Sequence, residues 1–341
     1  METPSLMHVE ARAAASLVAL QRQTNRVTIE RLVASLHAKP PRFVVTLARG
    51  SSDNAATYAR YLIERQLGCL TGSLSPSVSS VYSSALDFTG SLLIAVSQSG
   101  RSPDIVGTAR SARERGARIV ALVNDETSPL AAEADFFLHI GAGPERSVAA
   151  TKTFTLSLVA LLDFIAKWSE DGGLRTELDM LPERLEASFD LDWSTALAPL
   201  RNARNMFVVA RGHAHGVAQE MALKLKETCS IHGEAISAAE VRHGPMALVD
   251  RGFPILFIGQ NDASLSDTSE LAHSFSARGA QVMHSGLNFD GGIDLPCLEV
   301  DSRVQPILQV QSFYRFCEEL ARARGFDPDR PPYLNKVTQT V

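Results

Sequence analysis

The sequence predicts an α/β protein built from two tandem, doubly wound parallel sheets. Short apolar segments alternate with segments of helical periodicity along most of the 341 residues, and this alternation is typical of parallel sheets with helices on both faces. The pattern also occurs twice. Ala48-Arg49-Gly50 closes one apolar segment, and Ala210-Arg211-Gly212 closes another at an offset of 162 residues (50 to 212). The register of this repeat indicates an internal duplication.

The first half of the chain is expected to form a long helix followed by alternating strands and helices. The short segments are continuously apolar, whereas the longer ones repeat apolar residues at helical spacing. The expected strands are 42–48, 92–96, 119–123 and 136–140, and the expected helices are 5–36, 53–64, 103–115 and 153–168.

The second half repeats this pattern, and together the elements predict five consecutive segments. Strands are expected at 205–210 and 254–259, and helices near 178–191, 217–229 and 306–323. The predicted segments are an N-terminal helical segment (1–38), a first subdomain (39–170), a helical connector (171–200), a second subdomain (201–326) and a C-terminal tail (327–341). The proline-rich tail is expected to lie across a functional site.

The segment from Leu92 to Asp104 is the clearest candidate for ligand binding. A buried strand runs directly into Ser97-Gln98-Ser99-Gly100, and a helix is expected to begin at Pro103 with Ser102 as its N-cap. Hydroxyl groups, backbone N–H groups and the positive end of a helix dipole would meet in this turn. The turn has one glycine where nucleotide-binding loops need two or three, so it predicts a site for a single phosphate group.

The second copy lacks these hydroxyl groups. Its corresponding turn reads Gly259-Gln260-Asn261-Asp262. Only the first subdomain is therefore expected to bind the phosphate.

Composition excludes several classes of protein. With 45% hydrophobic and 21% charged residues and a net charge of −5, the chain is expected to be an ordinary globular protein, and it lacks the basic character typical of nucleic-acid binding. No apolar run approaches the roughly 20 residues of a membrane span, and the N-terminus does not resemble a signal peptide. The four cysteines are scattered, which argues against disulfides or a zinc site and favours the cytoplasm.

Six motifs occur in an order that resembles the double sugar-isomerase (SIS) family. They combine hydroxyl-rich turns with charged segments on a helix and on the tail. The motifs are Gly50-Ser51-Ser52, Ser97-Gln98-Ser99-Gly100, Val148-Ala149-Ala150-Thr151-Lys152, Leu223-Lys224-Leu225-Lys226-Glu227, Arg242-His243-Gly244-Pro245 and Asn335-Lys336-Val337-Thr338. From about residue 40 onward the chain is similar to the isomerase half of glucosamine-6-phosphate synthase, and the resemblance implies two flavodoxin-like SIS subdomains.

The resemblance implies conversion of glucosamine 6-phosphate and water to fructose 6-phosphate and ammonia. The glutaminase half of the synthase is expected to be absent, because residues 1–40 are too few to contain it. Arg101 and Ser102 stand where the synthase has an acidic residue and a threonine, and the motif around Lys336 also differs slightly. These differences resemble the stand-alone SIS-type deaminases. Ring opening and proton transfer need acid–base groups and a phosphate anchor, and neither a cofactor nor a metal.

The resemblance also implies roles for four candidate catalytic residues. Glu227 would be the base for proton transfer between C2 and C1. His243 would open the sugar ring from the neighbouring subunit, which implies a homodimer, and histidine is the side chain most often used for such proton transfer. Lys336 would reach the C1/C2 end of the sugar, the alternative being a solvated lysine on a frayed tail. Lys224, one helical turn before Glu227, would tune its charge or form a plain surface ion pair.

Seven further residues are candidates for substrate binding. The expected phosphate ligands are Ser97, Gln98, Ser99 and Ser102. Ser51 and Ser52 are expected to bind the sugar hydroxyls, and Val148 is expected to contact the substrate through its backbone. The alternative for the first group is an ordinary turn between a strand and a helix, and Thr151-Lys152 could simply cap the following helix.

Other functions stay open at this point. The substrate could instead be galactosamine 6-phosphate or a fructosamine-type phosphate. A non-enzymatic sugar-phosphate sensor is a further alternative, because SIS modules occur in transcriptional regulators. Such regulators usually carry a DNA-binding segment and a single SIS unit, and a sensor has no need of the set Glu227, His243 and Lys336.

Overall fold

A computed structural model describes residues 4–334 and 336, and these residues form two compact units that interleave along the chain. The first-sheet unit comprises residues 16–145 and 152–179. The second-sheet unit comprises residues 4–15, 146–151, 180–334 and 336. The consecutive boundaries expected from the sequence stay a prediction, because these units are defined by contacts and exchange short segments near residues 15 and 150.

The sheet of the first unit is fully parallel. Its strands are β1 (Phe43–Leu47), β2 (Thr71–Ser73), β3 (Ser91–Ser97), β4 (Arg118–Val123) and β5 (Phe136–His139), in the order β2-β1-β3-β4-β5. The order reverses direction between β1 and β3, so the loops that follow these two strands flank a topological switch point, where ligands bind in sheets of this kind. All seven residues of β3 are buried, as its continuous apolar sequence predicts.

Seven helices of the described chain have most or all of their residues in this unit. They are α1 (Leu6–Ala38), α2 (Ser51–Leu67), α3 (Pro76–Ser80), α4 (Pro103–Glu114), α5 (Pro129–Ala132), α6 (Lys152–Trp168) and α7 (Gly172–Asp179). The first turns of α1 belong to the second-sheet unit. The buried face of α4 joins β1, β3 and β4 in one apolar cluster, whereas α2 packs on α6.

The second sheet repeats the topology of the first. Its strands are β6 (Asn205–Ala210), β7 (His232–Ser237), β8 (Pro254–Ile258), β9 (Gln281–Ser285) and β10 (Ile293–Asp294), all parallel, in the order β10-β9-β8-β6-β7. Strand for strand this is the order of the first sheet, since β6 corresponds to β1 and β7 to β2. The predicted fold class and the predicted duplication are confirmed.

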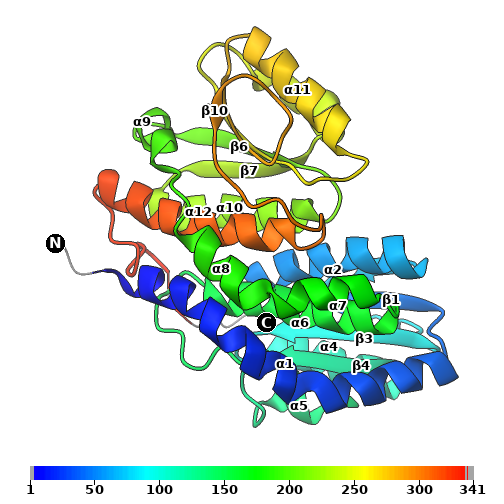
Figure 1. The fold of residues 1–341 in the computed structure, drawn as a ribbon. Helices are drawn as coiled ribbons and strands as arrows, with labels where there is room; N and C mark the ends of the chain where they lie inside the picture. Colours follow the sequence, from blue (N-terminus) through cyan, green and yellow to red (C-terminus); the bar gives the residue numbers. More distant parts are fainter. Residues whose placement is uncertain (1–3, 335, 337–341) are drawn as a thin grey trace. The chain divides into compact units, whose positions relative to one another are not determined.

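The helices of the second-sheet unit cover both faces of its sheet. They are α8 (Leu181–Phe189), α9 (Leu197–Leu200), α10 (Ala214–Cys229), α11 (Leu265–Ala277) and α12 (Gln305–Ala323), with short 3-10 turns at Ser194–Ala196, Glu240–Arg242 and Pro245–Leu248. Figure 1 shows α11 on one face and α10 on the other, and α12 packs against α10 and α8. Among the helices in the described part of the chain, none is both long and apolar enough to span a membrane.

Strands β2 and β7 are among those that the sequence prediction missed. Strand β2 has only three residues, Thr71–Ser73, and one of them is glycine. Strand β7 reads His-Gly-Glu-Ala-Ile-Ser and carries two exposed polar side chains. Both lie beside the first strand of their sheet, where pairing of the backbone rather than side-chain propensity decides the conformation.

The turn after β3 depends on glycine at position 100, and this dependence can be tested by substitution. Gly100 has a φ of +61°, and an added Cβ would lie 2.3 Å from Ser128 Oγ. Gly68 has the same φ of +61°, with no atom within 4 Å of an added Cβ. Gly68→Ala should cost about 1 kcal/mol of unfolding free energy for the left-handed backbone alone. Gly100→Ala should cost about 1–3 kcal/mol more, because it also creates a steric clash.

Urea unfolding of the two variants measures this difference. Equal losses at positions 68 and 100 would show that Ser128 moves aside freely and that the turn is not tightly packed.

Candidate functional site

The turn between β3 and α4 has the geometry that the sequence predicts. Ser102 is the N-cap of α4 and Pro103 is its first helical residue, yet the Ser102 side chain makes no capping hydrogen bond. Its hydroxyl is therefore not used to cap the helix to which it belongs. A group bound at this helix end could accept a hydrogen bond from that hydroxyl. A negatively charged group would also be stabilised by the helix dipole.

The hydroxyls inside the turn act as acceptors. Ser97 Oγ accepts a hydrogen bond from the backbone N–H of Gly100 at 3.1 Å, and Ser99 Oγ accepts one from the N–H of Arg101 at 3.3 Å. The carbonyl of Gln98 accepts the N–H of Asn124 at 3.2 Å, which fixes the turn to the end of β4. A serine hydroxyl that accepts a hydrogen bond keeps its own proton as a donor. These contacts shape the turn and leave chemistry suited to an anion.

The loop after β1 lies next to this turn at the switch point. Ser51 and Ser52 open α2, whose N-cap Gly50 has a φ of +53° and provides no capping side chain. Arg49 donates to the Asp104 carboxylate at 2.7 and 3.0 Å, and the Asp104 side chain is 0% exposed. This ion pair joins the β1 loop to the first turn of α4. The two residues are 55 positions apart, so no local pattern in the sequence could reveal the pair.

One carboxyl beside these serines is electrostatically perturbed. Burial raises the pKa of Asp53 above its usual value, and the charges of Arg60 and Arg49 and a hydrogen bond with Ser73 oppose that increase. Asp53 stands in the first turn of α2, so its ionised form also benefits from the helix dipole.

The corresponding loops of the second sheet are filled by the protein itself. Gln260 Oε1 accepts the N–H of Ala214 at 3.2 Å, which caps α10, and Gln260 Nε2 donates to Asp262 at 2.8 Å. Gln309 Nε2 donates to the carbonyl of Gly259 at 2.9 Å. Side-chain amides therefore occupy the strand ends that carry hydroxyls in the first sheet, in line with a phosphate site in the first copy alone.

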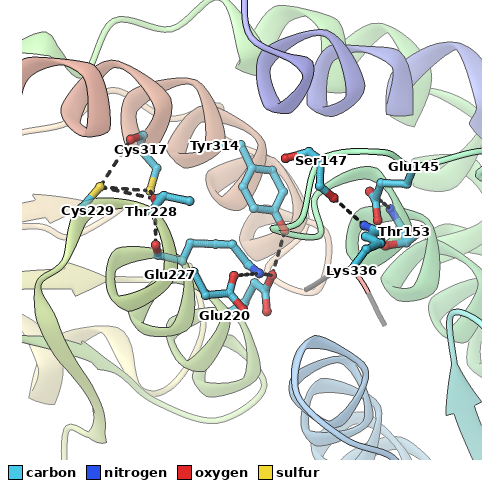
Figure 2. A network of polar contacts seen from close by, with 11 residues as sticks. Glu145, Ser147, Thr153, Glu220, Glu227, Thr228, Cys229, Tyr314, Cys317 and Lys336 are labelled. Carbon is cyan, nitrogen blue, oxygen red and sulfur yellow. Dashed lines mark hydrogen bonds and ion pairs between the residues drawn. The ribbon is translucent and has the colours of Figure 1, made fainter. Parts of the chain in front are cut away.

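The candidate catalytic helix α10 buries a lysine between two carboxylates. Lys224 is 1% exposed at its side chain, Glu220 is 0% exposed, and Glu227 is 20% exposed. The Lys224 ammonium lies 3.4 Å from Glu220 Oε1 and forms an ion pair and hydrogen bond with Glu227 Oε2. Because Lys224 is buried, the surface ion pair considered as an alternative is wrong. Figure 2 shows Glu220 and Glu227 converging on this amine.

Helix α12 completes this buried network. The hydroxyl of Tyr314 donates to Glu220 Oε1 at 3.3 Å (Figure 2). The free thiol of Cys229, the last residue of α10, lies 3.7 Å from the free thiol of Cys317 on α12. Burial raises the pKa of the Cys317 thiol well above its usual value, whereas the hydrogen bond with Cys317 lowers the pKa of Cys229.

The tail lysine is held by a backbone carbonyl. Lys336 Nζ donates to the carbonyl of Ser147 at 2.6 Å, one residue before the half-buried Val148 (Figure 2). The other members of the expected tail motif, Asn335, Val337 and Thr338, lie outside the described residues, so the predicted position of the tail over the active site stays a prediction. Thr151 directly precedes α6, as expected of a residue at a helix start.

His243 has a different environment from the other candidates. It follows the 3-10 turn Glu240–Arg242, its backbone N–H donates to the carbonyl of Glu240 at 2.9 Å, and the residue is exposed. An exposed position is compatible with the expected contribution to a neighbouring subunit, which stays a prediction.

The structure groups the candidates by unit. Glu227 and Lys224 touch, and both belong to the second-sheet unit with His243, Val148 and Lys336. The six serine and glutamine candidates belong to the first-sheet unit. Sequence reasoning missed Glu220 and Tyr314; the spacing of Glu220 four residues before Lys224 was an available signal, whereas Tyr314 had none. Within residues 4–334 and 336, no cluster of three or more His, Cys, Asp or Glu side chains could hold a metal.

Removing the Lys224 amine should destabilise the protein strongly. In Lys224→Met the fully buried Glu220 would lose its compensating charge, and breaking a buried pair in this way costs about 3–5 kcal/mol of unfolding free energy. Lys226→Met is the matched control on the same helix, because Lys226 is exposed and donates only to the carbonyl of Gly233 at 2.9 Å. It should cost less than about 1 kcal/mol. Urea unfolding at neutral pH compares the two variants, and similar losses would refute the network.

A family of known proteins matches most of this chain. The model of the SIS domain matches residues 39–167 and 199–284. The glutamine–fructose-6-phosphate aminotransferase (isomerizing) of Pyrobaculum aerophilum is 34% identical over 313 residues, which are 87% of this chain and 51% of that protein. The chain thus spans about half the length of the curated relatives that it matches.

Solved structures show the same fold. A protein of Silicibacter pomeroyi DSS-3 that has been proposed to be a phosphosugar isomerase is 41% identical, with a TM-score of 0.92 over 96% of this chain and 100% of that one. The C-terminal domain of glucosamine-fructose-6-phosphate aminotransferase from Francisella tularensis is 26% identical, with a TM-score of 0.84 over 96% and 99%. Glucosamine-6-phosphate deaminase of Thermotoga maritima, at 24% identity and a TM-score of 0.74 over 96% and 99%, shares the fold.

Proposed function

Because this chain belongs to the SIS domain family, we propose that it is an isomerising enzyme that acts on a sugar phosphate. The finer proposal is deamination of an amino-sugar phosphate: glucosamine 6-phosphate and water give fructose 6-phosphate and ammonia. The observation that carries the proposal is the difference in solvent exposure among the charged side chains of the network on α10. Glu220 and Lys224 are buried, whereas Glu227 is 20% exposed and has its charge compensated by Lys224. A carboxylate held in this way suits a base that must meet a substrate.

The proposed reaction begins with ring opening, for which His243 is the acid–base candidate. Glu227 then removes the proton from C2 of the open-chain amino aldehyde and delivers it to C1. In net terms the nitrogen gives up one proton and the oxygen at C1 gains one, so the carbonyl at C1 becomes a hydroxyl and the C2–N bond becomes an imine. Water adds to C2, ammonia leaves, and a ketone remains. Lys336 is assigned to the C1/C2 end, where it would assist ring opening or imine chemistry.

The phosphate is assigned to the turn after β3. Ser97, Ser99 and Ser102 offer hydroxyls, and Gln98 lies between them. Ser51 and Ser52, after β1, are assigned to the sugar hydroxyls, and Val148 to a backbone contact. The Ser102 hydroxyl, which caps nothing in α4, supports this assignment. We further propose that the protein acts in the cytoplasm.

The proposal is tested with the purified protein and glucosamine 6-phosphate, without glutamine and without an added cofactor. Ammonia and fructose 6-phosphate should appear at equal rates. Glu227→Gln should lower kcat by at least about a thousandfold, because it removes the base while its shape is retained. Glu114→Gln, the same substitution at the exposed end of α4, is the control that should keep most of the activity.

The products also decide between the alternatives. Activity with galactosamine 6-phosphate or a fructosamine phosphate, and none with glucosamine 6-phosphate, would move the proposal to that substrate. Binding of these sugar phosphates with no turnover would favour the sensor.

The predicted homodimer can be tested separately by mixing two inactive variants. If His243 acts in the site of the partner subunit, His243→Ala and Glu227→Gln chains are each inactive, but a mixed dimer contains one intact site. Equimolar mixing after subunit exchange should therefore restore about a quarter of the activity of the unaltered protein. Mixing that restores nothing, with exchange verified by mass spectrometry, would place His243 in the site of its own chain.

A further inference from the structure

We propose that Glu10 is a positioning residue that holds the amine of Lys336 in place through the backbone of Arg146 and Ser147. The proposal rests on the proposed function for the role of Lys336 in the reaction, but its geometry is independent of that role. All four residues belong to the second-sheet unit.

Glu10 uses both of its carboxylate oxygens on one short backbone segment. Oε1 accepts the N–H of Arg146 at 2.6 Å, and Oε2 accepts the N–H of Ser147 at 3.1 Å. The residue is 7% exposed, so contacts with the protein, these two donors among them, take the place of water around its charge. Charge-assisted hydrogen bonds of this kind are about twice as strong as neutral ones. The carboxylate therefore fixes two consecutive peptide planes.

The next peptide group carries the contact to the tail. The carbonyl of Ser147 accepts a hydrogen bond from Lys336 Nζ at 2.6 Å. Peptide groups are planar, so only the φ and ψ of Ser147 separate this carbonyl from the planes that Glu10 holds. Ser147 is 0% exposed, and close packing limits both angles. The position of the amine thus follows from the position of Glu10.

Glu10 itself stands on a firmly anchored part of α1. Asp329, also from the tail, accepts the N–H groups of Leu6 and Met7 at 2.7 and 2.8 Å and so caps the helix. Gln311 of α12 donates to the carbonyl of Ala11 at 2.8 Å. These contacts, one turn before Glu10 and one residue after it, leave the helix little freedom to rotate. The tail is therefore attached at two points, Asp329 and Lys336, to parts that this helix holds.

A carboxylate is the side chain that this arrangement requires. Two adjacent backbone N–H donors need two acceptors, and Gln offers one acceptor and one donor. In Glu10→Gln one N–H would face an NH₂ group, and the segment 146–147 would have to move. Glu30→Gln is the matched control on the same helix, because the Glu30 carboxylate is partly exposed and its ion pair with Arg26 spans 4.0 Å.

The test measures the reactivity of Lys336 in the full chain without substrate. An amine-acylating reagent is applied to the unaltered protein, Glu10→Gln and Glu30→Gln, and labelling of Lys336 is quantified by mass spectrometry against the exposed Lys39. When the segment 146–147 moves in Glu10→Gln, the hydrogen bond from Lys336 to Ser147 should weaken by about 1 kcal/mol. The labelling rate of Lys336 should then rise about fivefold. Glu30→Gln should change nothing. An unchanged rate in a folded Glu10→Gln protein overturns the proposal.

Kinetics provides the readout that a merely structural role would not give. Glu10→Gln should lower kcat by about tenfold to a hundredfold, as a displaced functional group does, with little change in KM. In a Lys336→Ala background the same substitution should have little further effect, because the group that it positions is gone. Additive losses overturn the proposal.

The role of Glu10 can also be decided if the variant does not fold or if the protein has no deaminase activity. If Glu10→Gln does not fold, hydrogen exchange of the unaltered protein decides: the amides of Arg146 and Ser147 should exchange at least about tenfold more slowly than in an unstructured chain, and unprotected amides overturn the proposal. If the unaltered protein deaminates no amino-sugar phosphate, the proposed function fails, while the labelling experiment still decides the role of Glu10.

Discussion

A lysine ammonium without access to water must be surrounded by compensating charge, and this requirement organises the second-sheet unit. Lys224 is 1% exposed and sits between Glu220 and Glu227 on its own helix. Two carboxylates lie around one ammonium, and Tyr314 of α12 donates a hydrogen bond to the buried one. The network thus links α10 to α12, and the single carboxylate that it leaves partly open is the candidate base. The same arrangement therefore compensates the charge of Lys224 and leaves the carboxylate of Glu227 partly exposed.

The two sheets show how one topology can serve different purposes. Both have the same strand order, and both reverse direction between equivalent strands. After β3, serine hydroxyls and the N-terminus of a helix lie together in the turn that we assign to the phosphate. After β8, the amides of Gln260 and Gln309 satisfy the backbone instead. The difference lies in side chains at the strand ends and not in the fold, which is why function must be argued from those side chains.

The sequence predicted what depends on local pattern. The buried strand β3, the N-cap Ser102, the first-turn Pro103 and the duplication all follow from periodicity, residue type and spacing, and the structure has them. Strands β2 and β7 were missed, because pairing with a neighbouring strand forms them from polar residues. The Arg49–Asp104 pair and the Tyr314–Glu220 contact were missed because they join residues 55 and 94 positions apart. No local signal carries such contacts.

The interleaving of the two units has a consequence for how the chain folds as it is synthesised. The described residues of the first-sheet unit are complete once residue 179 has been made, so that unit can fold while the rest of the chain is still being made. The contact between Leu6 and Asp329 closes across 323 positions. The first residues of α1 therefore find this partner only after residue 329 has been made. Contacts of such high order are slow to form, so the first turns of α1 reach their final contacts after the first-sheet unit has had time to fold.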